Sequence, residues 1–201
     1  AGRDLLFATQ LQWAGSQGVL LVGAGILGPQ VAGGIRAAQN LVGFLNTLLL
    51  VVENTVPVKA AYRYAQEGLE GLEAFFRRTN ILGGTVLCGL AVLLVLLAEP
   101  LIQLLYGAEY RAYAFVVFWQ SLYFILGFLY RQLTYFHRTV SNTTVIAGTS
   151  LLSSALSLAL VLLLAKNLTP LGIMLALVAG QAASLLSAEV AKHRYVRRRY
   201  A

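Results

Sequence analysis

Polar side chains form two regularly spaced rows within the otherwise apolar stretch of residues 27–57. The first row is Gln39, Asn46 and Glu53, and the second, one position further on, is Asn40, Thr47 and Asn54. Seven residues make almost two helical turns, so both rows are expected on one face of a helix. A polar stripe on a membrane helix is typical of the wall of a water-filled cavity. Such side chains can also hydrogen-bond neighbouring helices, and this second interpretation stays open here.

The preceding apolar stretch carries a similar set of polar residues, with Gln10 and Gln17 on one face. We therefore expect two helices to share a polar lumen, and the residues predicted to line it are Gln10, Gln17, Gln39, Asn40, Asn46 and Thr47.

Two charged residues mark the ends of the striped helix. Arg36 stands at the outer end, either as an interface anchor or as a partner for an anionic head group at the mouth of the lumen. Glu53, near the opposite end, is either a carboxylate that reaches the interface or a cavity acid that couples to protons or cations. Pro57 has no N–H for the carbonyl of Glu53, so a kink is expected there.

Catalytic and metal-binding patterns are absent from the sequence. It contains no H-E-x-x-H, no phosphate-binding loop and no G-x-S-x-G, and its single cysteine, Cys88, has no histidine nearby. Neither an enzyme nor a metal or cofactor site is therefore expected.

The composition is that of a polytopic membrane protein. Hydrophobic residues make up 58% of the 201 residues and charged residues 11%, against about 45–50% and about 25% in an average soluble domain. A spanning helix needs about 20 mostly apolar residues. We predict an all-α fold, one six-helix transmembrane lobe over residues 1–201, with spans at about 5–27, 34–57, 80–98, 112–130, 144–165 and 171–188.

Charged residues concentrate between and after these spans. Residues 66–78 are predicted to form an amphipathic connector at the membrane surface, and residues 191–201 a basic tail. With both termini in the cytoplasm, 12 of the 15 basic residues fall on the inner side, as the positive-inside rule requires. The net charge of +7 is thus spread over loops that meet the bilayer, and nucleic acid is not an expected partner.

Small residues recur at every fourth position of the sixth predicted span. They are Ala176, Gly180, Ser184 and Ala188. This spacing predicts a ridge on which another helix packs closely.

Two long stretches resemble one transporter family. Residues 27–78, LGPQVAGGIRAAQNLVGFLNTLLLVVENTVPVKAAYRYAQEGLEGLEAFFRR, resemble a helix that ends in proline and is followed by a cytoplasmic amphipathic connector. Residues 96–139 resemble the turn and helix that follow, through Ala98-Glu99-Pro100-Leu101, Leu105-Tyr106-Gly107 and Glu109-Tyr110. The family is the O-antigen and teichoic-acid exporter branch of the multidrug/oligosaccharidyl-lipid/polysaccharide exporter superfamily. The sequence departs from its pattern at Ile35, where the family often has an aromatic residue.

The resemblance implies a flippase that works by alternating access in the bacterial plasma membrane, where lipopolysaccharide and related polysaccharides are built. Its cargo would be an undecaprenyl-pyrophosphate-linked oligosaccharide. Family members have two six-helix lobes, so this chain resembles a C-terminal lobe that requires the missing N-terminal lobe or a second copy. The alternatives are an ion-coupled multidrug exporter lobe, which would depend on Glu53, and a non-catalytic membrane scaffold subunit.

Overall fold

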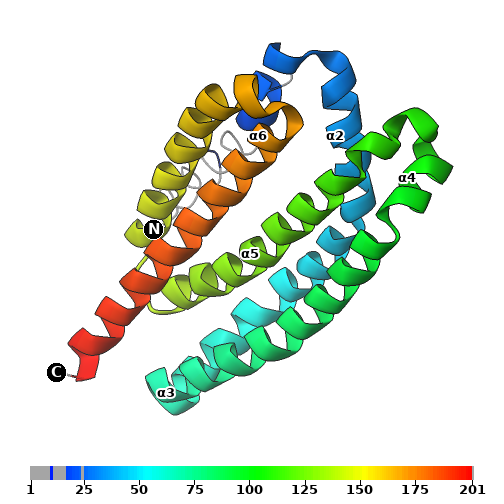
Figure 1. Ribbon diagram of the computed structural model, residues 1–201. Coiled ribbons are helices and arrows are strands. Elements are labelled where there is room, and N and C mark those ends of the chain that lie inside the picture. Colours follow the sequence, from blue (N-terminus) through cyan, green and yellow to red (C-terminus); the bar gives the residue numbers. More distant parts are fainter. Residues whose placement is uncertain (1–9, 11–16, 24, 201) are drawn as a thin grey trace.

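The computed structural model describes residue 10, residues 17–23 and residues 25–200, and every regular element in this part of the chain is a helix (Figure 1). Residues 17–23 and 25–27 are helical and precede the first labelled element. The labelled elements are α2 (Pro29–Val42), α3 (Phe44–Leu96), α4 (Ala98–Tyr106), the 3-10 helix η1 (Ala108–Tyr113), α5 (Ala114–Thr139) and α6 (Thr144–Tyr200).

Helix α3 doubles back on itself at Gly68, where φ is 66° and ψ is −150°. This conformation favours glycine because a side chain would collide with the backbone. Residues 44–67 form the first arm and residues 69–96 the second. Val56 of the first arm belongs to the same buried cluster as Leu72 of the second, so the arms are packed together near the turn.

The chain reverses direction at Gly68, the residue of α3 with non-helical backbone angles, and the span predicted to end at about Pro57 continues as helix past that proline. Proline removes only one helical hydrogen bond, a loss that membrane helices tolerate. The predicted connector, residues 66–78, includes this turn, and its residues beyond Gly68 continue directly into the second arm.

Helix α6 also consists of two apolar stretches, Thr144–Leu164 and Pro170–Arg199. Figure 1 shows them running side by side in opposite directions, and they are called the first and second arms of α6. The hydroxyl of Ser153 on the first arm donates a hydrogen bond to the carbonyl oxygen of Gly180 on the second, at 2.8 Å.

Small residues of the second arm are buried against neighbouring helices, as the sequence predicted, with Gly180 against the first arm of α6 and Ala188 against α5. Ala176, Ser184 and Ala188 are at most 3% exposed. A Cβ added at Gly180 would overlap Ser157 Oγ and lie 3.0 Å from the carbonyl oxygen of Ser153.

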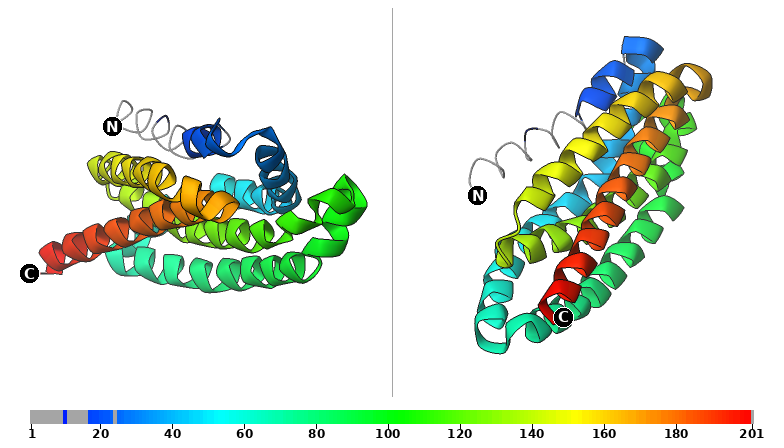
Figure 2. Two further views of the ribbon diagram at one scale, coloured as in Figure 1. Left: turned by 45° about the horizontal axis from the view of Figure 1, so that its top comes forward. Right: turned by 90° about the vertical axis from the view of Figure 1, so that its left-hand side faces the viewer.

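Helix α5 lies between the α3 hairpin and the α6 hairpin and packs against both (Figure 2). The main buried cluster joins side chains from all these elements, among them Leu45, Val116, Phe128, Ile173 and Met174. The Gly68 turn, the α5–α6 connection and the C-terminal end of α6 lie at one end of the bundle, which we call the tail end (Figure 1). The start of α2, α4 and the turn between the two arms of α6 lie at the opposite end (Figure 1).

Four helices in the described residues are long and apolar enough to cross a membrane. They are Phe44–Leu96, Ala108–Thr139, Thr144–Leu164 and Pro170–Arg199. Large apolar side chains cover the outside of the second arm of α3, with Val86 and Val92 both 58% exposed. Such a surface is suited to lipid rather than to water. Most of the first predicted span, residues 5–27, lies outside the described residues.

A polar cavity as the candidate functional site

A cavity of about 390 Å³ opens in the middle of the bundle. It lies between the helix at residues 17–20, α2, the first arm of α3, α5 and the second arm of α6. Its polar lining residues are Gln17, Arg36, Gln39, Asn40, Asn46, Gln120, Tyr123, Arg131 and Gln181. The sequence proposed eight candidates, namely the six lumen residues together with Arg36 and Glu53, and five of them are brought together here from three separate segments.

Arg36 organises one end of the cavity. Its Nη1 donates to Gln39 Oε1 at 3.2 Å, and its Nη2 lies 3.4 Å from Gln17 Oε1. Position 39 is close to one turn after position 36 on α2, which places the two side chains on the same face. The guanidinium itself is exposed, so it can still meet an anion.

Two buried glutamines form the deeper wall, and the sequence-based reasoning missed both. Gln120 comes from α5 and Gln181 from the second arm of α6, and each is 5% exposed. Gln120 Oε1 and Gln181 Nε2 have no hydrogen-bond partner. A buried amide atom without a hydrogen-bond partner destabilises a protein by about 1–3 kcal/mol. A hydrogen bond from a ligand or from water would remove this destabilisation. The available signal was a single amide in an apolar span, which often marks a functional position.

An ion pair stands at the other end of the cavity. Arg131 Nη1 of α5 lies 3.3 Å from Glu53 Oε2 of the first arm of α3. Arg131 lines the cavity, whereas Glu53 contacts Arg131 from outside the cavity lining. The sequence predicted a role for Glu53 but counted Arg131 only as one of the basic residues on the inner side.

Thr47 does not line the cavity, contrary to the prediction. The wall follows positions 40, 43, 46 and 49 instead of a seven-residue row. Each three-residue step turns the lining face by about 60° around the helix. Beyond Asn46 the wall has therefore rotated away from Thr47, which is exposed outside the cavity.

Gln10 is also absent from the cavity wall. Its side chain is exposed, and its neighbours at 1–9 and 11–16 lie outside the described residues.

Aromatic rings complete the wall on α5. Tyr123 and Phe124 both line the cavity, and their ring centroids are 6.2 Å apart at an interplanar angle of 86°. Gly127, one turn further along α5, exposes bare backbone to the same space. The cavity thus combines amides, two arginines and aromatic rings.

This set of groups can bind a ligand that carries hydroxyls and negative charge. Each amide supplies both donors and acceptors, which suits hydroxyl groups, and arginine forms paired hydrogen bonds with phosphate oxygens. Aromatic faces and edges can pack against the C–H surfaces of a polar ring compound. Comparison of the chain with protein-family models, with curated proteins and with solved structures finds no match.

Proposed function

We propose that this chain is one lobe of a membrane transporter that moves a lipid-linked oligosaccharide across the bacterial plasma membrane. The observation that carries the proposal is the amide-lined cavity, which lies among helices long and apolar enough to span a bilayer. The sugar would pass through the cavity while the lipid tail stays in the membrane. The lobe would rock against a partner lobe in an alternating-access cycle.

The two arginines support an undecaprenyl-pyrophosphate carrier as the cargo. Arg36 and Arg131 lie at different ends of the cavity, and both line it. A pyrophosphate could meet one guanidinium when the cavity opens on one side and the other guanidinium when it opens on the opposite side. The amides between them, such as Asn46 and Gln181, would bind sugar hydroxyls on the way.

The proposed topology has six spans with both termini in the cytoplasm. The two arms of α3, α5 and the two arms of α6 supply five spans, and the first predicted span, 5–27, supplies the sixth. Many basic residues lie near the Gly68 turn and in the C-terminal part of α6, which share the tail end of the bundle (Figure 1). By the positive-inside rule this end faces the cytoplasm.

A second lobe would close the open side of the cavity. Asn40 and Asn46 line the cavity yet are exposed, and Thr47 and Glu53 continue this exposed polar surface along the helix. An exposed polar strip on an apolar helix is unfavourable in lipid. We propose that the missing N-terminal lobe or a second copy of this chain covers it.

The pairing of Glu53 weighs against the drug-exporter alternative. Such a transporter would need an acid that is free to exchange a proton or bind a cation, whereas Glu53 lies 3.3 Å from Arg131.

Labelling with a membrane-impermeant, hydrophilic maleimide tests whether the cavity contains water. In a full-length protein whose Cys88 is replaced by alanine, we expect Asn46→Cys to react and Ser184→Cys, which is 3% exposed, to stay unreactive. An unreactive Asn46→Cys would mean that the wall is packed and dry, as in a scaffold subunit.

A flipping assay in proteoliposomes tests the cargo. Transport of an undecaprenyl-pyrophosphate-linked oligosaccharide should fall at least about ten-fold in Arg36→Ala, since charged hydrogen bonds contribute about 1.5–3 kcal/mol each. Asn54→Ala is a matched control, because Asn54 donates to the carbonyl of Leu50 and lies outside the cavity. Unchanged transport by Arg36→Ala would contradict the role of Arg36 at the head group.

A further inference from the structure

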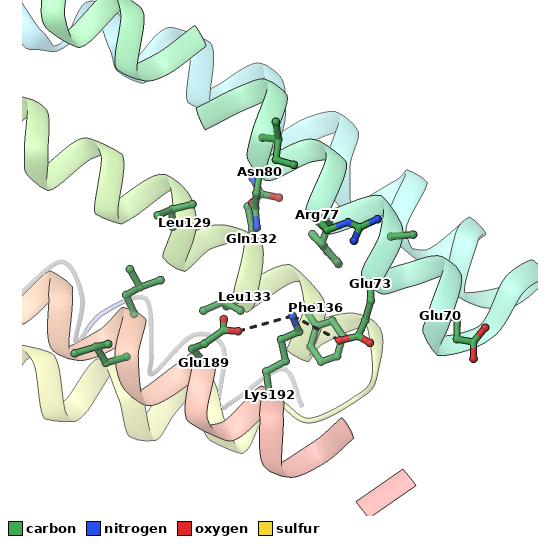
Figure 3. A pocket seen from close by; sticks show the side chains of 15 residues that line it. Glu70, Glu73, Arg77, Asn80, Leu129, Gln132, Leu133, Phe136, Glu189 and Lys192 are labelled. Carbon is green, nitrogen blue, oxygen red and sulfur yellow. Dashed lines mark ion pairs between the residues drawn. The ribbon is translucent and has the colours of Figure 1, made fainter. Parts of the chain in front are cut away.

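A second and larger space, about 790 Å³, lies at the tail end of the bundle, and we call it the tail-end groove. Its sides are the second arm of α3 and the second arm of α6, and its floor is α5 (Figure 3). The two sides pack against α5 rather than against each other. Lys192 of α6 reaches across the mouth and lies 3.6 Å from Glu73 Oε1 of α3.

Two amide side chains that line this groove, one buried and one half-buried, have atoms without a hydrogen-bond partner. Gln132 on its floor is 1% exposed, and neither of its amide atoms has a partner. Asn80, on the facing α3 arm, has an unpartnered Oδ1 (Figure 3). Both residues line the groove. A buried glutamine without a hydrogen-bond partner destabilises the protein unless a ligand or water bonds to it. The floor of the groove therefore suits a ligand with polar atoms.

The mouth of the groove carries both signs of charge. Glu70, Glu73 and Glu189 supply three carboxylates, against Arg77 and Lys192. Lys192 is held between Glu73 and Glu189 and stands over the Phe136 ring, 5.5 Å from its centroid. Glu70 and Arg77 form no ion pair within the described residues, which leaves one carboxylate and one guanidinium available at the mouth.

The groove walls are apolar beyond the two amides. Ile81 and Leu186 border it and are 62% and 66% exposed, so the groove opens onto the surface that faces lipid. Leu129, Leu133 and Leu185 continue this wall inward. A water-soluble ligand would gain little from such walls, whereas an acyl chain would gain about 0.8 kcal/mol for each buried CH₂ group.

Along α3 these groups follow a fixed order. From the mouth inward come a free carboxylate (Glu70), a guanidinium (Arg77), an amide (Asn80) and an apolar side chain (Ile81), over about 16 Å of helix. A phospholipid with an ethanolamine headgroup presents its ammonium, phosphate, glycerol esters and acyl chain in the same order. The excess of carboxylates at the mouth favours a headgroup that carries a positive charge over one that is only anionic.

We propose that the tail-end groove is a binding site for a phospholipid whose headgroup combines a phosphate with a primary ammonium. Glu70 accepts hydrogen bonds from the ammonium, and Arg77 donates to the phosphate. Gln132 and Asn80 bind the ester region, and one acyl chain lies on Ile81 and Leu186. This site is separate from the polar cavity, and it does not depend on the proposed transport function.

Lipid retention by the purified full-length chain tests the proposal. The protein is exchanged into micelles that contain equal amounts of phosphatidylethanolamine, phosphatidylcholine and phosphatidylglycerol with identical acyl chains, and the lipids that stay bound are counted by mass spectrometry. We expect phosphatidylethanolamine to exceed each of the others about five-fold, the ratio that corresponds to one net hydrogen bond. Phosphatidylcholine shares the phosphate and esters but has no N–H to donate.

Two variants separate the headgroup from the floor of the groove. Glu70→Gln should reduce the preference for phosphatidylethanolamine over phosphatidylcholine to near one, while Glu109→Gln, an exposed glutamate in η1 outside the groove, should leave it unchanged. Gln132→Leu should lower retention of phosphatidylethanolamine about five-fold. The substitution removes a buried amide that has no hydrogen-bond partner. The melting temperature of the Gln132→Leu protein without added lipid should therefore equal or exceed that of the wild type.

Equal retention of the three lipids, or a preference for phosphatidylglycerol, would overturn the proposal. So would a Glu70→Gln protein that keeps the wild-type preference. A Gln132→Leu protein with wild-type retention would show that the floor does not contact the lipid and would likewise overturn it.

Discussion

Polar residues serve opposite purposes in two neighbouring regions of this bundle. Where α5 meets the first arm of α6, Tyr130 Oη lies 3.0 Å from Thr149 Oγ1 and 3.3 Å from Ser150 Oγ. Between the two arms of α6, Ser153 donates to the carbonyl oxygen of Gly180. These hydroxyls are buried or half-buried and are satisfied by other protein groups, and we call the two contacts together the hydroxyl seam.

The polar cavity lies directly beside this seam and uses longer side chains. Gly180 belongs to the seam, while the next residue, Gln181, lines the cavity. A hydroxyl is short and readily finds a nearby carbonyl. A glutamine amide has more hydrogen-bonding positions to satisfy, and in the cavity one atom each of Gln120 and Gln181 has no partner. In these two regions the hydroxyls join one helix to another, whereas the amides line open space.

The largest effect on stability should come from adding a side chain within the hydroxyl seam. Gly180→Ala places a Cβ against Ser157 Oγ and 3.0 Å from a backbone oxygen, so the two arms of α6 must separate. Overpacking of this kind costs about 1–3 kcal/mol, and the melting temperature in detergent should fall. Gly148→Ala is a matched control, because a Cβ there meets nothing within 4 Å and should leave stability equal or higher. Equal melting temperatures for the two variants would mean that the seam is not closely packed.

Removing one seam hydroxyl should have a smaller effect. Tyr130→Phe deletes the partner of Thr149 and Ser150 without changing the ring. We expect a loss of about 1 kcal/mol, within the range measured for hydrogen bonds between membrane helices. Reversible unfolding in mixed micelles would measure it, and a double variant with Thr149→Val should show less than the sum of the single effects.

Removing a polar group from the cavity wall, in contrast, should not destabilise the protein. Gln181→Leu removes an amide whose Nε2 has no partner, so the free energy of unfolding should stay equal or rise by up to about 1 kcal/mol. Transport in the flipping assay should fall, which separates function from stability. A clear loss of stability in Gln181→Leu would place this residue with the seam instead of the cavity.

The smallest stability effect should come from the ion pair at the end of the cavity. The side chains of Arg131 and Glu53 are 36% and 49% exposed, and such pairs contribute little. Glu53→Gln should change the melting temperature by an amount equivalent to at most about 0.5 kcal/mol. Transport should persist in this variant if Glu53 only neutralises Arg131, whereas abolished transport would support a coupling role for the acid.

Periodicity within one helix was enough to predict part of the cavity. Spacing along α2 and α3 identified Gln39, Asn40 and Asn46, and the structure groups them with Arg36 and Gln17. Thr47 lies outside this cavity because a seven-residue row assumes that the wall runs parallel to the helix axis, whereas this wall crosses it obliquely.

Residues on other helices could not be found in this way. Gln120, Arg131 and Gln181 belong to no regularly spaced polar row, and only the packing of α5 and α6 brings them to α2. The all-helical fold and the small-residue ridge were predictable from composition and from local spacing. The position of the turn within α3 could not be predicted, because the positive φ of Gly68 appears only in the structure.

Helix α5 forms a wall of both the polar cavity and the tail-end groove. Gln120 and Arg131 face the first, and Gln132 and Phe136 face the second. A shift or rotation of α5 therefore alters the two spaces together. Thermodynamic linkage then requires the coupling to be reciprocal. If a ligand in the groove changes the affinity of the cavity for cargo by some factor, cargo in the cavity changes the affinity of the groove for that ligand by the same factor. The composition of the surrounding bilayer would in this way act as an effector of the lobe.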